Sequence, residues 1–323
     1  MRLAYSLGSL LSINEIVECS RIIADHKPDS IWIPETWGME NFSMLATVSQ
    51  IAKNSKIGSS ILNIYSRTPS LIAMGAVTID TLSGGRLILG LGTSSEPIVQ
   101  DWHGLEFSSP VQRMREYVDI IRLITSGNPV DYSGKFFKLK NFTLLIKPPR
   151  KNIPIYMAAV NKKMVNLCWE IADGAIFYLR PLAELKSTIQ QMQANRKIEV
   201  ASQFITCMSE DEEKAVNRAK RTLAFYISVG KIYRNFLANN GFKNETENIY
   251  EEYKKTGLTS NYNLVTDAML EDLVIYGTPE DCRKRLQRFI DAGVTLPIIQ
   301  FNPIDSVIES CELLVSTLSG RQT

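Results

Sequence analysis

Histidine is scarce in this sequence, which contains only His26 and His103 among its 323 residues. A zinc site or a serine, histidine and aspartate triad therefore has few possible centres. The five cysteines are far apart, odd in number and form no CxxC pair, so they indicate neither a disulfide framework nor a set of zinc ligands. We expect buried thiols and no resident metal.

Long apolar runs and a strong net charge are also missing. No segment reaches the roughly 18 apolar residues of a membrane-spanning helix, and residues 1–5 predict the start of a strand rather than a signal peptide. The formal net charge is +2, which is too small to indicate a nucleic acid or an acidic membrane as partner. We therefore expect a cytoplasmic protein that acts on a small molecule.

What the sequence does contain is a regular succession of short apolar runs, most of them followed by an amphipathic segment. Eight runs predict strands, at residues 3–7, 31–33, 56–62, 86–91, 154–158, 174–177, 200–208 and 297–301. Parallel strands need helical crossovers, and eight of them close a sheet. We therefore predict an α/β fold, a (β/α)8 TIM barrel with insertions, as one domain over residues 1–323. A doubly wound open sheet is the alternative.

Two segments interrupt this succession. Residues from about 129 to 146 alternate about a Ser-Gly turn and predict a hairpin insertion. Residues from about 230 to 262 are rich in Tyr, Asn, Lys and Glu, with Gly241 and Gly257 as punctuation. We predict a helical insertion or lid in this second segment.

Polar residues follow the ends of several predicted strands. The functional sites of a barrel lie at the C-terminal strand ends, so these residues would surround one mouth. The segments are Glu35-Thr36-Trp37, Leu62-Asn63-Ile64-Tyr65, Thr93-Ser94-Ser95 and Ala159-Val160-Asn161. The strand that precedes Thr93 is framed by glycines, since it is entered through Gly84-Gly85 and left through Gly92.

Three sites in the sequence, at Glu35, His103 and Asn161-Lys162-Lys163, have both a functional and a structural interpretation. Glu35 follows a proline at a strand end, so it is either a carboxylate with a shifted pKa or a surface loop acid. His103 either hydrogen-bonds a cofactor or holds its loop. Asn161-Lys162-Lys163 precedes a predicted helix, where a phosphate could bind the helix N-terminus, or the lysines could be solvated. The glycines match neither GxGxxG in its βαβ context nor GxxxxGK[ST].

Taken together, five motifs resemble the bacterial luciferase-like superfamily. They are Trp32 to Gly38, Tyr65-Ser66-Arg67-Thr68-Pro69, Ser83 to Ser94, Trp102-His103-Gly104 and Arg113-Met114-Arg115-Glu116-Tyr117. The resemblance is closest to the coenzyme F420-dependent branch, which includes methylenetetrahydromethanopterin reductase, glucose-6-phosphate dehydrogenase and secondary alcohol dehydrogenase. It implies a barrel with the cofactor ring in its mouth, and a bulge with a non-prolyl cis peptide at Ser60-Ile61.

The resemblance also implies site residues. The cofactor ring and its ribityl chain would contact Glu35, Thr36, Ser60, Ile61, Asn63, Thr93 and Ser94, and the phosphate would be held at Val160, Asn161 and Lys162. Thr36 stands where the alcohol and sugar-phosphate enzymes carry a histidine, and Ser94-Ser95 stands where the sugar-phosphate enzyme carries an acid. Both departures argue against alcohol and sugar substrates. The methanogen reductases, however, carry an acid where this chain has Ser6.

The function that the resemblance implies is an F420-dependent oxidoreductase. It would transfer a hydride between C5 of the deazaflavin and an organic substrate, such as 5,10-methylenetetrahydromethanopterin or a related pterin. This reaction depends more on positioning and a dry pocket than on a strong acid, which suits the scarcity of histidine. Glu35 is the predicted catalytic residue, because it would orient the ring or neutralise developing positive charge.

Two other functions and an assembly remain as expectations. The alternatives are an FMN-dependent luciferase-like monooxygenase and a non-catalytic flavin-binding or deazaflavin-binding protein. We expect a homodimer or a higher homo-oligomer. Its interface could use apolar residues of the second and third predicted helices, namely Met44, Leu45, Ile72 and Met74.

Overall fold

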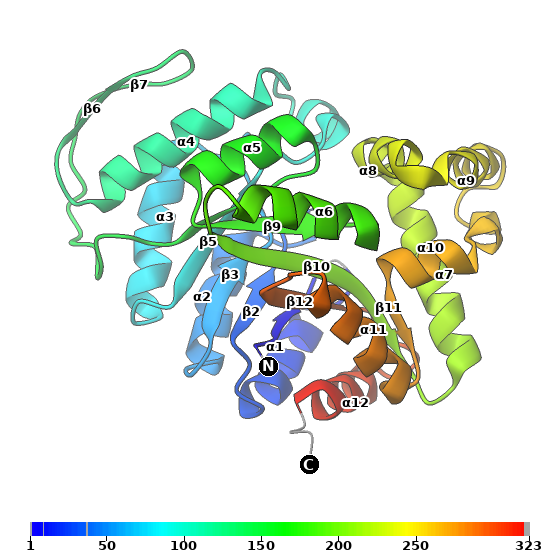
Figure 1. Ribbon diagram of the computed structural model, residues 1–323. Coiled ribbons are helices and arrows are strands. Elements are labelled where there is room, and N and C mark those ends of the chain that lie inside the picture. Colours follow the sequence, from blue (N-terminus) through cyan, green and yellow to red (C-terminus); the bar gives the residue numbers. More distant parts are fainter. Residues whose placement is uncertain (1, 9, 37, 320–323) are drawn as a thin grey trace.

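A closed barrel of eight parallel strands forms the centre of the computed structural model, which describes residues 2–8, 10–36 and 38–319 (Figure 1). In order around the barrel the strands are β1 (Ala4–Ser6), β2 (Ser30–Ile33), β3 (Lys56–Ser59), β5 (Leu87–Gly92), β8 (Ile155–Ala158), β9 (Gly174–Tyr178), β10 (Glu199–Met208) and β12 (Leu296–Phe301). The ring closes because β10 pairs with both β9 and β12, and β12 pairs with β1. The predicted TIM barrel is therefore confirmed, and each of the eight apolar runs overlaps one barrel strand.

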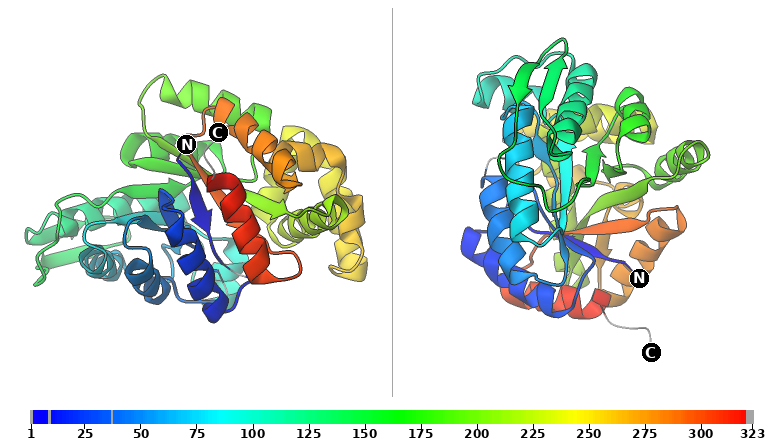
Figure 2. Two further views of the ribbon diagram at one scale, coloured as in Figure 1. Left: turned by 90° about the horizontal axis from the view of Figure 1, so that it is seen from below. Right: turned by 90° about the vertical axis from the view of Figure 1, so that its left-hand side faces the viewer.

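Helices surround this barrel and bury one face against it. They are α1 (Ile13–Asp25), α2 (Asn41–Ile51), α3 (Pro69–Leu82), α4 (Pro110–Thr125), α5 (Lys162–Ile171), α6 (Leu182–Gln193), α7 (Glu212–Val229), α11 (Pro279–Asp291) and α12 (Val307–Ser319). Local signals start several of them, such as the capping box of Ser12 and Glu15 before α1 and the Thr68 cap followed by Pro69 at α3. The last helix, α12, packs beside α1, so the first and last helices of the chain are neighbours (Figure 2).

Further elements lie outside this pattern. The strands β6 (Val130–Ser133) and β7 (Lys138–Phe142) form an antiparallel hairpin within residues 129–146, and it extends away from the barrel beside α4 (Figure 1). Residues 230–262 are mainly helical, with α8 (Lys231–Leu237), a π-helical turn (Ala238–Phe242), α9 (Lys243–Thr256) and the start of a 3-10 turn (Asn261–Leu264). The sequence analysis did not identify α6, α10 (Asp267–Leu273), β4 (Leu62–Asn63) or β11 (Ile275–Gly277).

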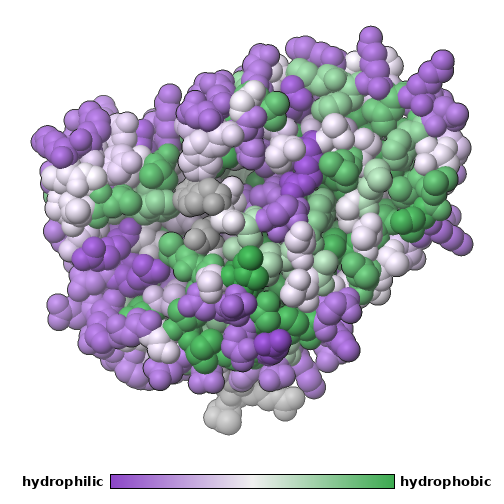
Figure 3. Space-filling model, turned by 180° about the vertical axis from the view of Figure 1, so that it is seen from behind, coloured by the Kyte–Doolittle hydropathy of each residue, from purple (hydrophilic) through white to green (hydrophobic). Residues whose placement is uncertain are grey.

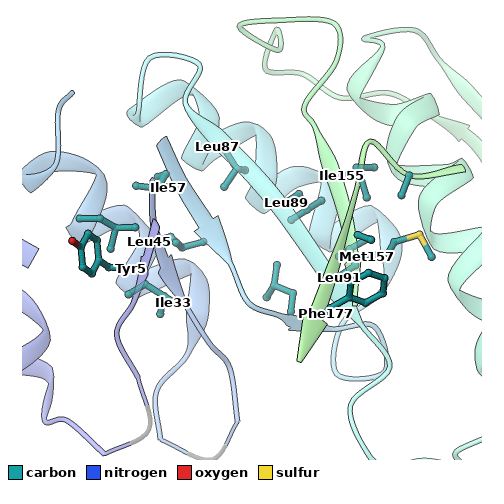
Figure 4. Packing of buried hydrophobic residues seen from close by; sticks show 14 of the residues in the cluster. Tyr5, Ile33, Leu45, Ile57, Leu87, Leu89, Leu91, Ile155, Met157 and Phe177 are labelled. Atoms are coloured by element: carbon teal, nitrogen blue, oxygen red, sulfur yellow. The ribbon is translucent and has the colours of Figure 1, made fainter. Parts of the chain in front are cut away.

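The core has two apolar layers. Outward-facing strand residues pack under the helices, and Figure 4 shows part of this layer, including Tyr5, Ile33, Leu87, Leu89, Leu91 and Met157. Inward-facing residues fill the barrel itself, namely Ala4, Trp32, Ile88, Tyr156, Ile176, Ala201, Leu296 and Ile298. Trp32 is fully buried, its indole N–H donates to Ser30 Oγ at 2.8 Å, and its ring leaves room for no Cβ at Gly58. The lower part of the barrel is therefore solid.

The proposed interface residues need a correction. Met44, Leu45 and Ile72 are buried in the core of this same chain, so the expectation that they form a subunit interface is wrong. They form the faces of α2 and α3 that pack against the barrel, and only Met74 of the four is exposed.

The chemical state of the cysteines agrees with the sequence prediction, because all five are free and buried. Within residues 2–319, apart from positions 9 and 37, no helix combines the length and the hydrophobicity needed to cross a membrane. Trp37, named beside Glu35 in the sequence analysis, lies outside the described residues.

Candidate functional site

The floor of the barrel mouth consists of the inward-facing strand residues that lie directly above the apolar layer filling the barrel. Side chains alternate along a strand, so the residue two positions after an interior residue points the same way. This rule places Ser6, Gly90, Ala158, Tyr178, Gln203 and Gln300 on the floor, two positions after Ala4, Ile88, Tyr156, Ile176, Ala201 and Ile298. Ser60 joins them, because its Oγ lies 3.5 Å from that of Ser6. The functional residues of a barrel are expected at this end.

The end of β3 forms a bulge. Gly58 pairs with Ile88 on β5, and Leu62 of β4 pairs with Leu91. Between these pairs, residues 59–61 face only residues 89 and 90 of β5, which defines a bulge. The peptide bond between Ser60 and Ile61 within this bulge is cis, although Ile61 is not a proline. The cis peptide that the resemblance implied is therefore present at the predicted bond.

Two glycines of β5 make room for the bulge. A Cβ on Gly90 would lie 1.8 Å from the backbone oxygen of Ser59, and a Cβ on Gly92 would lie 2.5 Å from the side chain of Ile61. The Ser59 hydroxyl donates to Gly90 O and accepts from Gly90 N–H, both at 2.8 Å, and so replaces the strand pairing that the bulge interrupts. This explains the glycines in the C-terminal half of the strand, whereas Gly84 and Gly85 before it have positive φ in the preceding turn.

Asn63, Thr93 and Ser94, which the sequence analysis predicts to contact the cofactor, lie in and after the strands that border the bulge. Asn63 is buried, and its Oδ1 accepts from Tyr65 N–H at 2.9 Å, while its Nδ2 has no hydrogen-bond partner in the described part of the chain. Thr93 and Ser94 are half-buried, and Ser94 has a left-handed backbone with φ of 57°. These three residues therefore share the edge of the mouth next to Ser60 and Ile61.

Glu35 lies at the rim, where it is held by an ion pair. Its two carboxylate oxygens accept from the Arg67 guanidinium at 2.7 and 2.8 Å, and one of them also accepts from Asn41 N–H at 3.2 Å. Arg67 also contacts Glu40, which caps α2. The pKa of Arg67 is raised, mainly by its hydrogen bond to Glu35. Thr36 follows Glu35 on the exposed side of the rim.

The predicted phosphate segment lies beside a cavity. Asn161 caps α5 by accepting from Met164 N–H, and Lys162 is exposed at the first turn of that helix. Val160 and Lys162 line a cavity of about 190 Å³ together with Arg180 and Phe236. The carbonyl oxygen of Val160 accepts from Arg180, so the segment and this cation are joined. Two cationic side chains therefore border this cavity, and Glu184, which also lines it, pairs with Arg180.

His103 is separate from these contacts. It is exposed and follows a π-helical turn (Ile98–Trp102) in the long loop after β5. Its backbone N–H donates to Ile98 O at 3.2 Å. This position agrees with the structural alternative, in which the residue belongs to its loop.

Sequence reasoning missed the polar side of the mouth. Tyr178 ends β9, Gln300 lies one residue before the end of β12, and Gln203 lies in the middle of β10. The sequence analysis identified these strands but did not consider these side chains. Gln203 Nε2 donates to Gln300 Oε1 at 3.1 Å, and Tyr178 packs edge-on against Tyr226 at 5.1 Å between ring centroids. The signal was present, because a polar residue at an inward position of an apolar strand is unusual in a core.

Fold and site together define a class. An eight-stranded parallel barrel whose third strand ends in a cis-peptide bulge over a glycine-lined floor has the features of the luciferase-like barrels that the sequence resembles. The chain belongs to the luciferase-like monooxygenase family, whose family model matches residues 2–296.

Several individual proteins match most of this chain. A Mycobacterium tuberculosis protein, named provisionally as a coenzyme F420-dependent oxidoreductase, is 28% identical, and the match covers 88% of this chain and 90% of the relative. The 5,10-methylenetetrahydromethanopterin reductase of Archaeoglobus fulgidus is also 28% identical, with 88% of each chain covered. The solved structure of the F420-dependent tetrahydromethanopterin reductase of Methanopyrus kandleri matches with a TM-score of 0.86 at 23% identity, over 98% of this chain and 97% of that one.

Proposed function

We propose that this protein is a coenzyme F420-dependent oxidoreductase. The reaction would transfer a hydride between C5 of the deazaflavin and an organic substrate, with 5,10-methylenetetrahydromethanopterin or a related pterin as the first candidate. The observation that carries the proposal is the bulge at the end of β3, where Gly90 and Gly92 of β5 leave room beside Ser60 and Ile61 at the barrel mouth. The relatives named for F420 and pterin chemistry support this choice within the family.

The residues of the bulge suit a planar ring. Gly90 and Gly92 have no side chains to occupy the floor, and Ile61 is a half-buried apolar residue that packs on the barrel interior. The buried Nδ2 of Asn63 has no partner among the described residues, and it suits a carbonyl oxygen at the edge of such a ring. A flat apolar support with a polar group at its edge is what a deazaflavin requires.

The cavity beside α5 suits an anionic group. Lys162 and Arg180 border it, and Asn161 caps the helix whose N-terminus lies there. Burial lowers the pKa of Arg180, and Glu184 neutralises part of its charge through hydrogen bonds to both carboxylate oxygens. Lys162 is therefore the stronger candidate for a direct contact with the cofactor phosphate.

When bound, F420 would supply the carbon that accepts or donates the hydride. The chain's own residues would then position the reactants and exclude water. Glu35 is held by Arg67 and by Asn41 N–H, which fixes its carboxylate at the rim where the cofactor ring would enter. We propose that it orients the ring rather than exchanging a proton.

Steady-state kinetics test this proposal. Reduced F420 is mixed with the protein and 5,10-methylenetetrahydromethanopterin, and the return of the oxidised deazaflavin absorbance is followed. The proposal predicts turnover that saturates with both reactants. Oxygen consumption that depends on reduced FMN would instead support the monooxygenase alternative. Binding of F420 without turnover by any pterin would support the non-catalytic alternative.

We also propose that the protein is a cytoplasmic homodimer. Free, buried cysteines are typical of a reducing compartment. The outer face of α3 carries the exposed residues Leu71, Met74 and Leu82. Figure 3 shows one face of the molecule, on which hydrophobic side chains gather in the lower centre and on the right. Such surfaces mark contacts with other chains. Light scattering of the purified protein and of the variant Leu71→Glu tests the assembly, since the variant should shift a dimer toward monomer.

A further inference from the structure

Two buried polar atoms on the floor of the mouth have no hydrogen-bond partner within the described residues. They are the hydroxyl oxygen of Tyr178, which lies beside the polar groups of Tyr226 and Gln300 without a well-formed hydrogen bond to either, and Oε1 of Gln203. The two residues are register partners on the neighbouring strands β9 and β10, so their side chains start side by side and point into the same mouth. Buried polar atoms in native proteins are nearly always paired. Two unpaired atoms at one place therefore indicate that a bound molecule supplies the partners.

A chain of hydrogen bonds fixes which atom of Gln203 is free. Asn302 Nδ2 donates to the backbone oxygens of Gln300 at 2.9 Å and Thr206 at 3.4 Å, so its Oδ1 must accept. That oxygen lies 3.5 Å from Gln300 Nε2, which also lies 3.4 Å from the Tyr226 hydroxyl. Gln300 therefore presents Oε1 to Gln203 Nε2, at 3.1 Å. The remaining Gln203 atom is an acceptor oxygen.

The Tyr178 hydroxyl is held in place by ring packing. Its ring meets those of Tyr226 and Tyr233 nearly edge-on, at centroid distances of 5.1 and 5.5 Å. Burial raises the pKa of Tyr178 well above its ordinary value, so the hydroxyl keeps its proton and is able to donate. The side chains that contact Tyr178 and Gln203 in these interactions are all uncharged. The pair therefore suits a neutral group that offers one donor and one acceptor.

Gln203 lies across the barrel from the bulge that we propose as the support for the cofactor ring. Around the ring of eight strands, β10 lies four strands away from β3, where the cis-peptide bulge ends. The glycines Gly90 and Gly92 and the residues of the bulge form the first side of the floor. Gln203 lies on the opposite side, between Tyr178 of β9 and Gln300 of β12. A ring lying over the bulge would leave the polar side to a second molecule, which is the substrate.

We propose that Tyr178 and Gln203 form the substrate-recognition pair and bind the edge of a cyclic amide, in which an N–H stands next to a C=O. The N–H would donate to Gln203 Oε1, and the Tyr178 hydroxyl would donate to the carbonyl oxygen. This inference rests on the proposed function and adds the chemical group by which the substrate is selected. A pterin carries such an edge, whereas simple alcohols and sugar phosphates do not.

The test uses the variants Tyr178→Phe and Gln203→Met, with 5,10-methylenetetrahydromethanopterin as the probe. The first removes only the hydroxyl and keeps the ring packing, and the second removes the acceptor at similar volume. Each should weaken pterin binding, and raise the KM for it, by about tenfold. The affinity for F420 should stay within about twofold. The matched control is Tyr5→Phe, which removes a buried hydroxyl that bonds Ser319 on the outside of the barrel.

Binding and kinetics are measured separately, so failure of the proposed function can be distinguished from failure of the substrate-recognition pair. If the unmodified protein shows no F420-dependent turnover, the proposed function fails, and calorimetric titration of the pterin still tests the pair. The inference is overturned if the unmodified protein binds no pterin, or if both variants bind it as tightly as Tyr5→Phe does. It is also overturned if the variants weaken F420 binding while pterin affinity stays unchanged, because the pair would then belong to the cofactor site.

Discussion

Arg67 donates two hydrogen bonds to the carboxylate of Glu35, at 2.7 and 2.8 Å, and thereby joins the loop after β2 to the start of α3. Both side chains are only 13 to 14% exposed, so water screens the pair weakly. A bidentate pair of this kind fixes the orientation of both groups. Glu35 is therefore a rigid part of the mouth rim and differs from a mobile surface acid.

Replacing Glu35 with Gln should reduce turnover while the fold survives. The amide keeps the shape of the side chain, but it loses the negative charge that balances Arg67 and leaves this cation partly unpaired. We expect a decrease in kcat of about tenfold and a loss of about 1 to 3 kcal/mol in unfolding free energy. The matched control is Glu40→Gln, which changes a more exposed partner of the same arginine. Turnover of Glu35→Gln equal to that of the control would contradict the assigned role.

A methyl group at Gly90 should damage the mouth. The new Cβ would meet the Ser59 carbonyl oxygen, which is backbone and has no rotamer to adopt, so the bulge must move. We expect Gly90→Ala to lower the unfolding free energy by about 1 to 3 kcal/mol and to weaken F420 binding. Gly38→Ala is the control, because no atom lies within 4 Å of a Cβ there. Thermal unfolding and cofactor titration of the two variants give the comparison, and equal results would argue against the glycine-lined support.

The neighbouring lysines at the start of α5 should differ in effect. Lys162 lines the cavity next to Val160 and Arg180, whereas Lys163 is exposed and is not among its lining residues. Lys162→Ala should raise the dissociation constant of F420 by roughly five- to tenfold at low salt, and added salt should reduce this difference. Lys163→Ala should leave the constant unchanged. An equal effect of both substitutions would indicate a diffuse charge effect instead of a phosphate contact.

Acid should loosen the hairpin insertion through Glu116. Burial by itself would raise the pKa of this carboxyl, but hydrogen bonds from the N–H groups of Phe136, Lys135 and Phe137 and from Gln112 lower the pKa below its ordinary 4.5. Because the pKa is lower in the folded state, the carboxylate stabilises the fold above pH 4.5, and this contribution is lost as the pH falls through the folded-state pKa.

Denaturant unfolding at neutral and acidic pH measures this contribution. We expect Glu116→Gln to lose about 1 to 3 kcal/mol at neutral pH and to lose less than the unmodified protein between neutral and acidic pH. Glu96→Gln serves as the control, because Glu96 is an exposed acid on the loop after β5. Parallel pH profiles for the unmodified protein and Glu116→Gln would show that the carboxylate charge does not hold the hairpin.

The barrel could be predicted because its signal is local. Each apolar run followed by an amphipathic segment marks one strand and one helix, and this succession needs no knowledge of contacts between distant residues. The cis bond at Ser60-Ile61 was expected from the resemblance alone. Only the structure shows that Gly90 and Gly92 lie against the bulge that contains this bond. Chain patterns alone do not show why Gly90 must lack a side chain.

The polar side of the mouth could not be assembled from the sequence. Tyr178, Gln203 and Gln300 are separated by up to 122 positions (300 minus 178), and their hydrogen bonds depend on the register of three strands. The interface prediction failed for a related reason. The apolar faces of α2 and α3 that hold Met44 and Ile72 are the faces that cover the barrel, and helical periodicity alone does not say which neighbour a face meets.

Equilibrium titration with F420 and FMN tests the central claim most directly. Fluorescence of the deazaflavin and absorbance of the flavin report binding to the unmodified protein and to Gly90→Ala. The account predicts saturable binding of F420 by the unmodified protein, much weaker binding of FMN, and loss of F420 affinity in the variant. Saturable binding of FMN with no binding of F420 would contradict it.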